Sequence, residues 1–228
     1  MGSTRLPGKV LRPLAGRPMI ERIIERLRRC QRPEILVLAT SLAPGEAPLV
    51  AWAEAHGVVV FRGAEDDVLD RYVSCARAHE LDAVVRATGD NPFVEPASLD
   101  GLVELFGASE AHYACALPSC GSGLPVGTGV EVMSREALEE SWQRGVLPHH
   151  REHVDEYILE HPERFGCAVY QPPATLTAPE LVLTVDTVEQ FDEADQIWRD
   201  YRAQHQDDLL PLEWVIAWKR RHSGEEPS

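Results

Sequence analysis

The sequence predicts an α/β fold in which helices cover a doubly wound, mostly parallel β-sheet. Helical and strand-like segments alternate along the first half of the chain, which is the order that this fold class requires. The strand-like segments are continuous apolar runs, as expected for strands buried on both faces. An aspartate closely follows two of these runs, where ligands bind in such sheets. A length of 228 residues suits one large domain.

The first helix is expected to open at Pro18 and to stop before Pro33. Its apolar side chains recur at helical spacing on one face, at Met19, Ile20, Ile23, Ile24 and Leu27. Charged residues occupy the opposite face, at Glu21, Arg22, Glu25, Arg26, Arg28 and Arg29. The run 34–40 then predicts a strand buried on both faces.

The alternation continues to residue 117. A helix over 46–56 is expected to end at Gly57, and Asp66 or Asp67 is expected to cap the next helix, which carries Val68, Leu69, Tyr72 and Val73 inward. We expect strands at 58–61, 83–88 and 112–117 and a further helix at 96–106.

The pattern becomes less regular after residue 117. Segment 118–129 contains four glycines and two prolines, which predicts a loop or lid. Beyond it we expect strands at 130–133, 167–171 and 181–185, helices at 135–144 and 149–161, and two closing helices up to residue 222. The final residues, 223–228, are expected to be disordered.

The overall composition excludes several kinds of partner. The chain has 37 acidic and 22 basic residues and a formal charge of −15, which argues against a general nucleic-acid or anionic-membrane binder. No apolar run is long enough to span a bilayer. We expect no secretory signal, because a glycine-rich motif begins at residue 2. The five cysteines are odd in number and lack a C-x-x-C pair, which predicts a reduced, cytoplasmic protein; they are Cys30, Cys75, Cys115, Cys120 and Cys167.

The motif G-S-T-R-L-P-G-K at 2–9 is a candidate anion-binding loop. Gly2 and Gly8 allow backbone N–H groups to converge on a phosphate, and Arg5 and Lys9 add cationic donors. The motif is not a Walker A loop, since five residues separate its glycines and Val10 follows the lysine. The alternative is an ordinary basic turn near a frayed terminus.

Two aspartates are candidate metal ligands. Asp90 follows the strand expected at 83–88, and Asp186 follows the strand expected at 181–185, so both carboxylates should lie over one edge of the sheet. Carboxylates combined with substrate phosphates are the usual ligands of Mg²⁺. The alternative is that each aspartate caps the next turn or helix.

Five motifs, in a fixed order along the chain, resemble those of a known enzyme family. They are G-S-T-R-L-P-G-K at 2–9, F-R-G-x-E-D-D-V-L-D-R-Y at 61–72, T-G-D-N-P-F at 88–93, R-E-H at 151–153 and L-T-V-D-T at 183–187. Together they resemble the cytidylyltransferase family of the acylneuraminate and spore-coat polysaccharide type. The resemblance implies a nucleotide-diphospho-sugar transferase fold that is Rossmann-like. It also implies transfer of NMP from an NTP, usually CTP with Mg²⁺, to a small sugar-like acceptor, with release of pyrophosphate.

The resemblance also implies site residues. The nucleotide would be bound by Gly2, Ser3, Arg5, Gly8, Lys9, Asp67, Arg71, Thr88 and Asp90. Arg5, Lys9, Asp90 and Asp186 would act in catalysis, with Asp90 and Asp186 holding the metal. Glu131 and Arg151 would face the acceptor. Residues 1–117 would then form the nucleotide-binding half of a single domain over 1–222, residues 118–187 the acceptor and dimerisation half, and residues 188–222 the C-terminal helices.

Alternatives within and beyond this reaction class stay open. A sister enzyme could use another NTP, and a catalytically silent relative could only bind nucleotide or dimerise; the presence of both Asp90 and Asp186 favours an active enzyme. No cysteine is expected to act as a nucleophile. A zinc site at His149-His150-x-x-His153 is not expected, because the spacing differs from H-E-x-x-H and no thiolate pair is near. A homodimer is expected, with 118–160 as a projecting arm.

A last expectation concerns the sheet. Relatives with this loop motif carry a buried strand immediately before it, and that strand would lie between the strands at 35–39 and 84–87. Without it, backbone groups there would be left unpaired, at about 1–3 kcal/mol for each buried group. We therefore expect a gap between these strands, a poorly anchored loop at 2–9, and a native protein that begins upstream.

Overall fold

The computed structural model describes residues 6–222. Its strands are β1 (Pro13–Leu14), β2 (Arg17–Pro18), β3 (Val37–Ser41), β4 (Val59–Gly63), β5 (Ala83–Arg86), β6 (Tyr113–Cys115), β7 (Glu131–Ser134) and β8 (Ala168–Val169). Its α-helices are α1 (Met19–Leu27), α2 (Ala47–Ala55), α3 (Val68–Ala78), α4 (Pro96–Ala108), α5 (Arg135–Arg144), α6 (Pro148–Glu152), α7 (Glu156–Leu159), α8 (Pro162–Phe165), α9 (Val188–Gln204) and α10 (Leu212–His222). Short 3₁₀ helices lie at Lys9–Leu11, Pro44–Glu46, Pro118–Cys120 and Ala174–Leu176.

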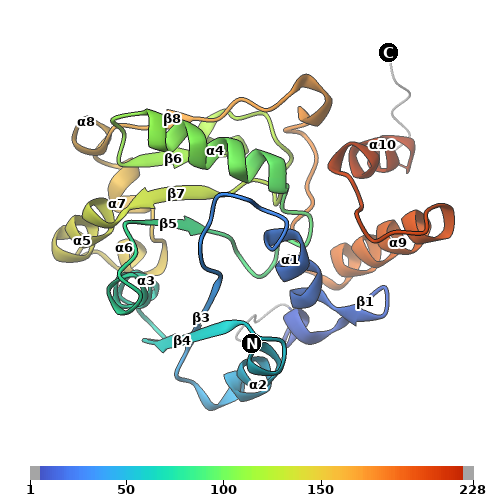
Figure 1. The fold of residues 1–228 in the computed structure, drawn as a ribbon, viewed down its shortest axis with the longest axis horizontal. Coiled ribbons are helices and arrows are strands. Elements are labelled where there is room, and N and C mark those ends of the chain that lie inside the picture. Colours follow the sequence, from blue (N-terminus) through green and yellow to red (C-terminus); the bar gives the residue numbers. More distant parts are fainter. Residues whose placement is uncertain (1–5, 223–228) are drawn as a thin grey trace.

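The larger strands form two sheets (Figure 1). β3 and β4 pair in parallel, whereas the other sheet has the order β5-β7-β6-β8. β7 runs antiparallel to both of its neighbours, and β8 is parallel to β6. The α/β class is confirmed, but the sheets are mixed, because the chain returns after segment 118–129 to insert β7 between β5 and β6.

The two sheets are not joined through β3 and β5. Over residues 6–222, β3 pairs only with β4, and β5 pairs only with β7. The expected gap between these strands is therefore confirmed. One consequence corrects the sequence analysis: the side chains of β3 are mostly half-buried, not buried throughout, because no neighbouring strand covers this edge. Residues 2–5 of the loop lie outside the described residues. Lys9, at the end of the loop, is held by hydrogen bonds to Val185 and Asp186.

Two predicted elements differ from the structure, and one observed element was not predicted. The single helix expected at 149–161 is two short helices, α6 and α7, with a break after Glu152. The expected strand at 181–185 is an extended segment with one parallel bridge, Val126 to Val182. It lies beside segment 118–129, whose irregular backbone cannot continue the pairing. The β1–β2 hairpin was not predicted; Ala15 and Gly16 form its turn, both with positive φ.

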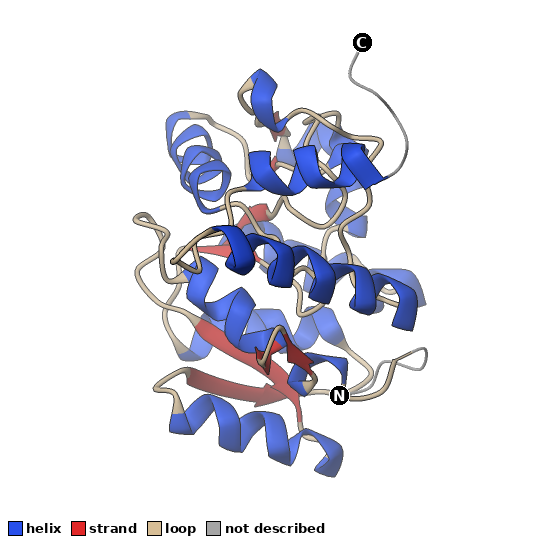
Figure 2. Cartoon of the chain, turned by 90° about the vertical axis from the view of Figure 1, so that its right-hand side faces the viewer, coloured by secondary structure: helices blue, strands red, loops and turns tan. Residues whose placement is uncertain are grey.

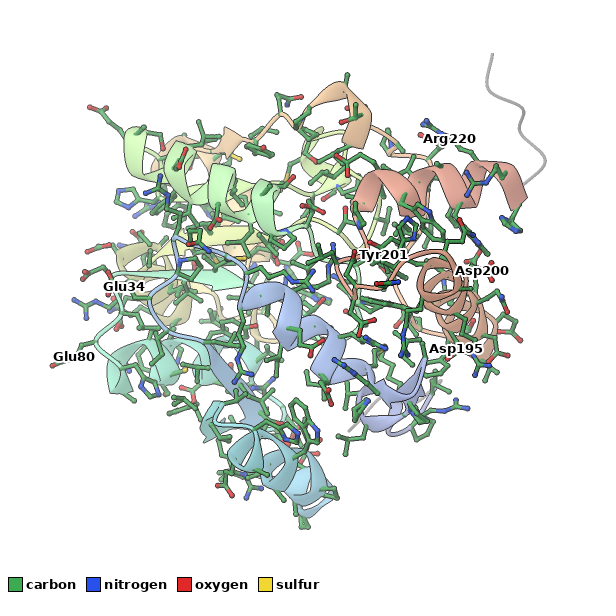
Figure 3. All side chains as sticks on the ribbon, turned by 45° about the vertical axis from the view of Figure 1, so that its right-hand side comes forward. Glu34, Glu80, Asp195, Asp200, Tyr201 and Arg220 are labelled. Carbon is green, nitrogen blue, oxygen red and sulfur yellow. A yellow bond between two sulfur atoms is a disulfide. The ribbon has the colours of Figure 1, made fainter. Side chains whose placement is uncertain are left out.

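The C-terminal helices close the main core. Figure 2 shows α9 as a long helix across this side of the molecule, with α10 above it. Asp200 and Tyr201 lie on α9 near α10 in Figure 3. The Trp218 indole donates to Asp200 Oδ2 at 2.8 Å, and Tyr201 packs edge-on against Trp214 at 5.2 Å between ring centroids. These contacts explain the apolar stripes seen in both helices.

The charged face expected on α1 is partly wrong. Arg22 and Arg26 are buried, because their planar guanidinium groups satisfy carbonyl oxygens inside the protein. Arg22 donates to Leu14 O at 3.3 Å and Ala15 O at 3.0 Å, and it stacks on the Trp198 ring. Buried arginines with this many partners fix α1 against the C-terminal helices.

The cysteines also differ from expectation. Cys115, at the end of β6, is joined by a disulfide to Cys120, whose Cα lies 6.4 Å away in the following 3₁₀ turn. The turn folds back and brings the two residues within bonding range. Cys30, Cys75 and Cys167 are free. Over residues 6–222, no helix has the length and apolar character needed to cross a bilayer.

Candidate active site

Asp90 and Asp186 come together, as the sequence predicted. A backbone hydrogen bond joins the two segments that carry these aspartates: Val185 N donates to Asp90 O at 2.8 Å. Lys9 lies with them: its Nζ is 2.9 Å from Asp186 Oδ1 and 3.8 Å from Asp90 Oδ2. Residues 177 positions apart in the chain therefore form one cluster. We call Lys9, Asp90 and Asp186 the strand-end cluster.

Lys9 is held in place by its own backbone and by the sheet. It begins a 3₁₀ turn whose preceding residue, Gly8, has φ of 69°, a conformation that glycine adopts without strain. Its side chain is 10% exposed and also donates to Val185 O at 2.7 Å. The adjacent Val10 lies close to Gly89, so the loop covers the segment that carries Asp90. Lys9 is thus a fixed cation between two carboxylates.

The donor set of this cluster fits a hard divalent cation. Two carboxylates share one ammonium ion, and their side chains are 31% and 28% exposed, so their oxygens stay open to solvent and to a ligand. Mg²⁺ prefers oxygen ligands of this kind and keeps water or phosphate in its remaining positions. The position of the ammonium group shows that positive charge is stable between these side chains.

Hydrogen bonds orient the carboxylate of Asp90 and hold the backbone of Asp186. Thr88 Oγ1 donates to Asp90 Oδ1 at 2.5 Å, and Asn91 Nδ2 donates to Thr88 Oγ1 at 2.8 Å. On the other side, Gln190 Oε1 accepts from Asp186 N at 2.8 Å, as part of the box that caps α9. Asn91 and Gln190 were missed by the sequence analysis, although T-x-x-Q before an apolar helix is a visible capping signal.

Two further predicted nucleotide contacts, Asp67 and Arg71, have partners at and near the start of α3. Gly2, Ser3 and Arg5 are outside the described residues. Asp67 caps α3 by accepting from Asp70 N at 2.8 Å, and its Oδ2 is 3.6 Å from Arg151 Nη1. Arg71 donates to Ala64 O at 2.5 Å. The structure thus brings Asp67 and Arg151 together, which the sequence did not indicate.

Glu131 belongs to a buried network instead of an open pocket. It is 1% exposed, it accepts from Tyr113 Oη at 2.5 Å, and it accepts from Arg86 Nη1 at 2.6 Å. β5 and β7 place Arg86 and Glu131 directly opposite each other. Burial, with Asp155 as a second cause, raises the pKa of Glu131 to about 7, against the opposing effect of Arg86.

Glu131 is expected to make stability fall with rising pH. Its folded pKa lies above its usual value of 4.5, so the folded state keeps a proton that the unfolded state releases between about pH 4.5 and 7. The stabilisation is complete below pH 4.5 and is lost as pH rises through 7. Glu131→Gln should flatten this part of the profile by roughly 2–3 kcal/mol, measured by urea denaturation from pH 4.5 to 8. An unchanged slope would contradict the raised pKa.

The histidines near α6 form a hydrogen-bonded group. His149 Nε2 and His150 Nε2 lie 2.8 and 2.9 Å from the two oxygens of Glu160. Leu147 N donates to His150 Nδ1, which leaves Nε2 of the neutral ring as the protonated nitrogen that donates to Glu160. A metal on Nε2 would require the opposite tautomer. The arrangement links α6 to the residue after α7 through Glu160.

The fold and the strand-end cluster define a class of protein. An α/β sheet with phosphate-loop and carboxylate side chains at its strand ends is typical of nucleotide-diphospho-sugar transferases. Residues 1–209 match the cytidylyltransferase family, and the chain belongs to that family of enzymes.

Individual relatives agree with this assignment. A spore coat polysaccharide biosynthesis protein of Bacillus subtilis is 33% identical over 228 residues, covering 96% of this chain and 91% of the relative. A 3-deoxy-manno-octulosonate cytidylyltransferase of Anaeromyxobacter dehalogenans is 28% identical, covering 66% of this chain and 62% of the relative. The structure of a cytidylyltransferase from Leptospira borgpetersenii superposes with a TM-score of 0.87 at 26% identity, covering 100% of this chain and 94% of that chain.

Proposed function

We propose that this protein transfers CMP from CTP to a sugar acid or a related small acceptor and releases pyrophosphate, in polysaccharide or surface-glycan synthesis in the cytoplasm. The observation that carries the proposal is the convergence of Lys9, Asp90 and Asp186 in a chain of the cytidylyltransferase family. The names of the Bacillus subtilis and Anaeromyxobacter dehalogenans relatives support a sugar acid as the acceptor and polysaccharide synthesis as the context.

The site residues match the needs of the reaction. An acceptor oxygen attacks the α-phosphorus, the bond to the pyrophosphate oxygen breaks, and the acceptor loses its hydroxyl proton. This step depends on positioning and on neutralising phosphate charge, with no protein nucleophile. Asp90 and Asp186 would hold Mg²⁺, which supplies Lewis-acid stabilisation of the phosphate oxygens when bound. Thr88 orients the carboxylate of Asp90, and Gln190 holds the backbone of Asp186.

Lys9 has a second role once a divalent cation binds. In the structure it provides the positive charge that the two aspartates share. With Asp90 and Asp186 holding Mg²⁺, the ammonium group of Lys9 would be placed to donate to a phosphate oxygen. Arg5 is the other candidate phosphate donor of the loop, from its place in the motif.

The decisive experiment is pyrophosphate release with each of the four NTPs, Mg²⁺ and a panel of sugar acids. Activity with CTP is expected. Activity confined to UTP or GTP would replace the nucleotide assignment and leave the reaction class intact. Absence of turnover with every NTP and acceptor would favour a catalytically silent relative that only binds nucleotide or dimerises.

Lys9→Ala should lower kcat/KM for CTP by about 2–4 kcal/mol of transition-state stabilisation, because a preorganised phosphate donor is lost. The measurement is steady-state kinetics, with thermal unfolding alongside, since Val185 O loses its partner as well. Lys219→Ala removes another lysine that pairs with a carboxylate, Glu193, and provides the control. Unchanged kcat/KM in the Lys9 variant would refute the role.

A homodimer is expected from the family resemblance, with residues 118–160 contributing to the contact. Sedimentation velocity at micromolar concentration should give twice the chain mass of 25.4 kDa. A species of 25.4 kDa across that range would contradict the expectation.

A further inference from the structure

Arg86 is a site residue that the sequence motifs do not single out. It is the last residue of β5, and it stands two positions before Thr88, whose hydroxyl orients Asp90. In open α/β sheets the carboxyl ends of strands border the ligand. Its side chain is 20% exposed, so part of it reaches solvent.

Buried side chains hold the guanidinium group of Arg86 in place. Glu131 accepts its Nη1 at 2.6 Å, and Tyr113 donates to the other oxygen of the same carboxylate at 2.5 Å. Tyr72 of α3 also borders the guanidinium group, and Asp155 adds negative charge from the segment before α7. An arginine has five N–H donors; one is used on Glu131, and the side chain of Tyr72 also hydrogen-bonds to Arg86.

Burying the charges of Arg86 and Glu131 costs desolvation free energy, which a purely structural role would not repay. A buried ion pair is often no more stabilising than an apolar pair of similar size, so β5 and β7 would pair equally well without it. It does fix one planar donor group at the strand end, with its rotamer set before any ligand arrives. Such preorganisation is what substrate-positioning residues require.

We propose that Arg86 binds an oxyanion of the acceptor, a carboxylate or a phosphate, and that Glu131 and Tyr113 position its guanidinium group for this contact. The inference rests on the proposed function and adds to it the residue that selects an acidic acceptor. A planar guanidinium group matches the two oxygens of such a group, whereas lysine offers a single point charge.

The test separates acceptor binding from nucleotide binding. Calorimetry measures Mg-CTP binding first, and then binding of 3-deoxy-manno-octulosonate or glucose 1-phosphate to the protein saturated with a non-hydrolysable CTP analogue. Arg86→Lys should keep CTP affinity and weaken binding of one of these sugars at least about 10-fold. The sugar that binds tells whether the oxyanion is a carboxylate or a phosphate.

Two further variants distinguish positioning from folding. Glu131→Gln keeps the size of the side chain and should weaken sugar binding about 3- to 10-fold at constant CTP affinity. Arg77→Lys changes an exposed arginine that pairs with Glu139 between α3 and α5, and it should behave like the wild type. Thermal unfolding of each variant shows whether it is folded.

Each outcome is decisive. Equal sugar affinity in wild type and Arg86→Lys would overturn the proposal, as would a CTP-loaded wild type that binds neither sugar. An equal loss of CTP and sugar binding in Glu131→Gln would overturn the positioning role. Failure of the wild type to bind Mg-CTP would instead overturn the proposed function itself.

Discussion

Asp90→Asn and Asp186→Asn should each lower kcat/KM by at least about 100-fold while the protein stays folded. The amide keeps the size and one oxygen of the carboxylate but removes its negative charge, which a hard cation requires. Both side chains are partly exposed and share Lys9 as a partner, so losing one charge leaves the other aspartate compensated. Steady-state pyrophosphate release at saturating Mg²⁺ gives the measurement.

Asp192→Asn is the matched control for these two variants. Asp192 lies on the exposed side of α9, close in sequence to Asp186, and its charge contributes equally to the net charge of the protein. It should keep the turnover of the wild type. If Asp90→Asn or Asp186→Asn also keeps it, that residue does not hold the metal.

The strand-end cluster could be predicted because its signals are local. Each aspartate follows an apolar run, and the direction of a strand decides which edge its last residue reaches. The same reasoning gave no role to Arg86, because it lies inside the strand expected at 83–88 and its partner is not visible in the local sequence. Only the antiparallel insertion of β7 places Glu131 opposite it, and no local pattern encodes that pairing.

The helices were predicted more accurately than the second half of the sheet. Spacing and caps locate α1, α3 and α5 well, since these signals act within a few residues. Segment 181–185 reads as a strand by composition, yet its neighbour is an irregular loop that offers a single bridge. β-Pairing depends on a partner elsewhere in the chain, which periodicity does not reveal.

Arg26 shows the same limit within a helix. Its charge placed it on the expected solvent face of α1, but the structure leaves it 2% exposed. Its partners come from residues 68 and 184 positions away: Nε donates to Val94 O at 2.6 Å, and Nη1 donates to Leu210 O at 2.8 Å. Glu95 lies 3.3 Å from Nη2. A buried charge of this kind is tolerated only when such partners are in place.

Arg26→Met should therefore destabilise the protein by about 3–5 kcal/mol. The substitution keeps an unbranched apolar stem, but it leaves Glu95 and two carbonyl oxygens without their donor. Burial already raises the pKa of Glu95 despite the nearby arginine, so its ionised form becomes costlier when the cation is gone. Urea denaturation at pH 7 measures the loss.

A second substitution tests the cause. Arg26→Met combined with Glu95→Gln should recover part of the lost stability, because the unpaired charge is removed while Val94 O and Leu210 O stay unsatisfied. Arg32→Met breaks an exposed pair with Glu104 and should cost at most about 1 kcal/mol. If Arg26→Met costs no more than that surface control, the guanidinium group does not hold α1 to the segment before α10. A large loss with no recovery in the double variant would assign the effect to the carbonyl oxygens and not to Glu95.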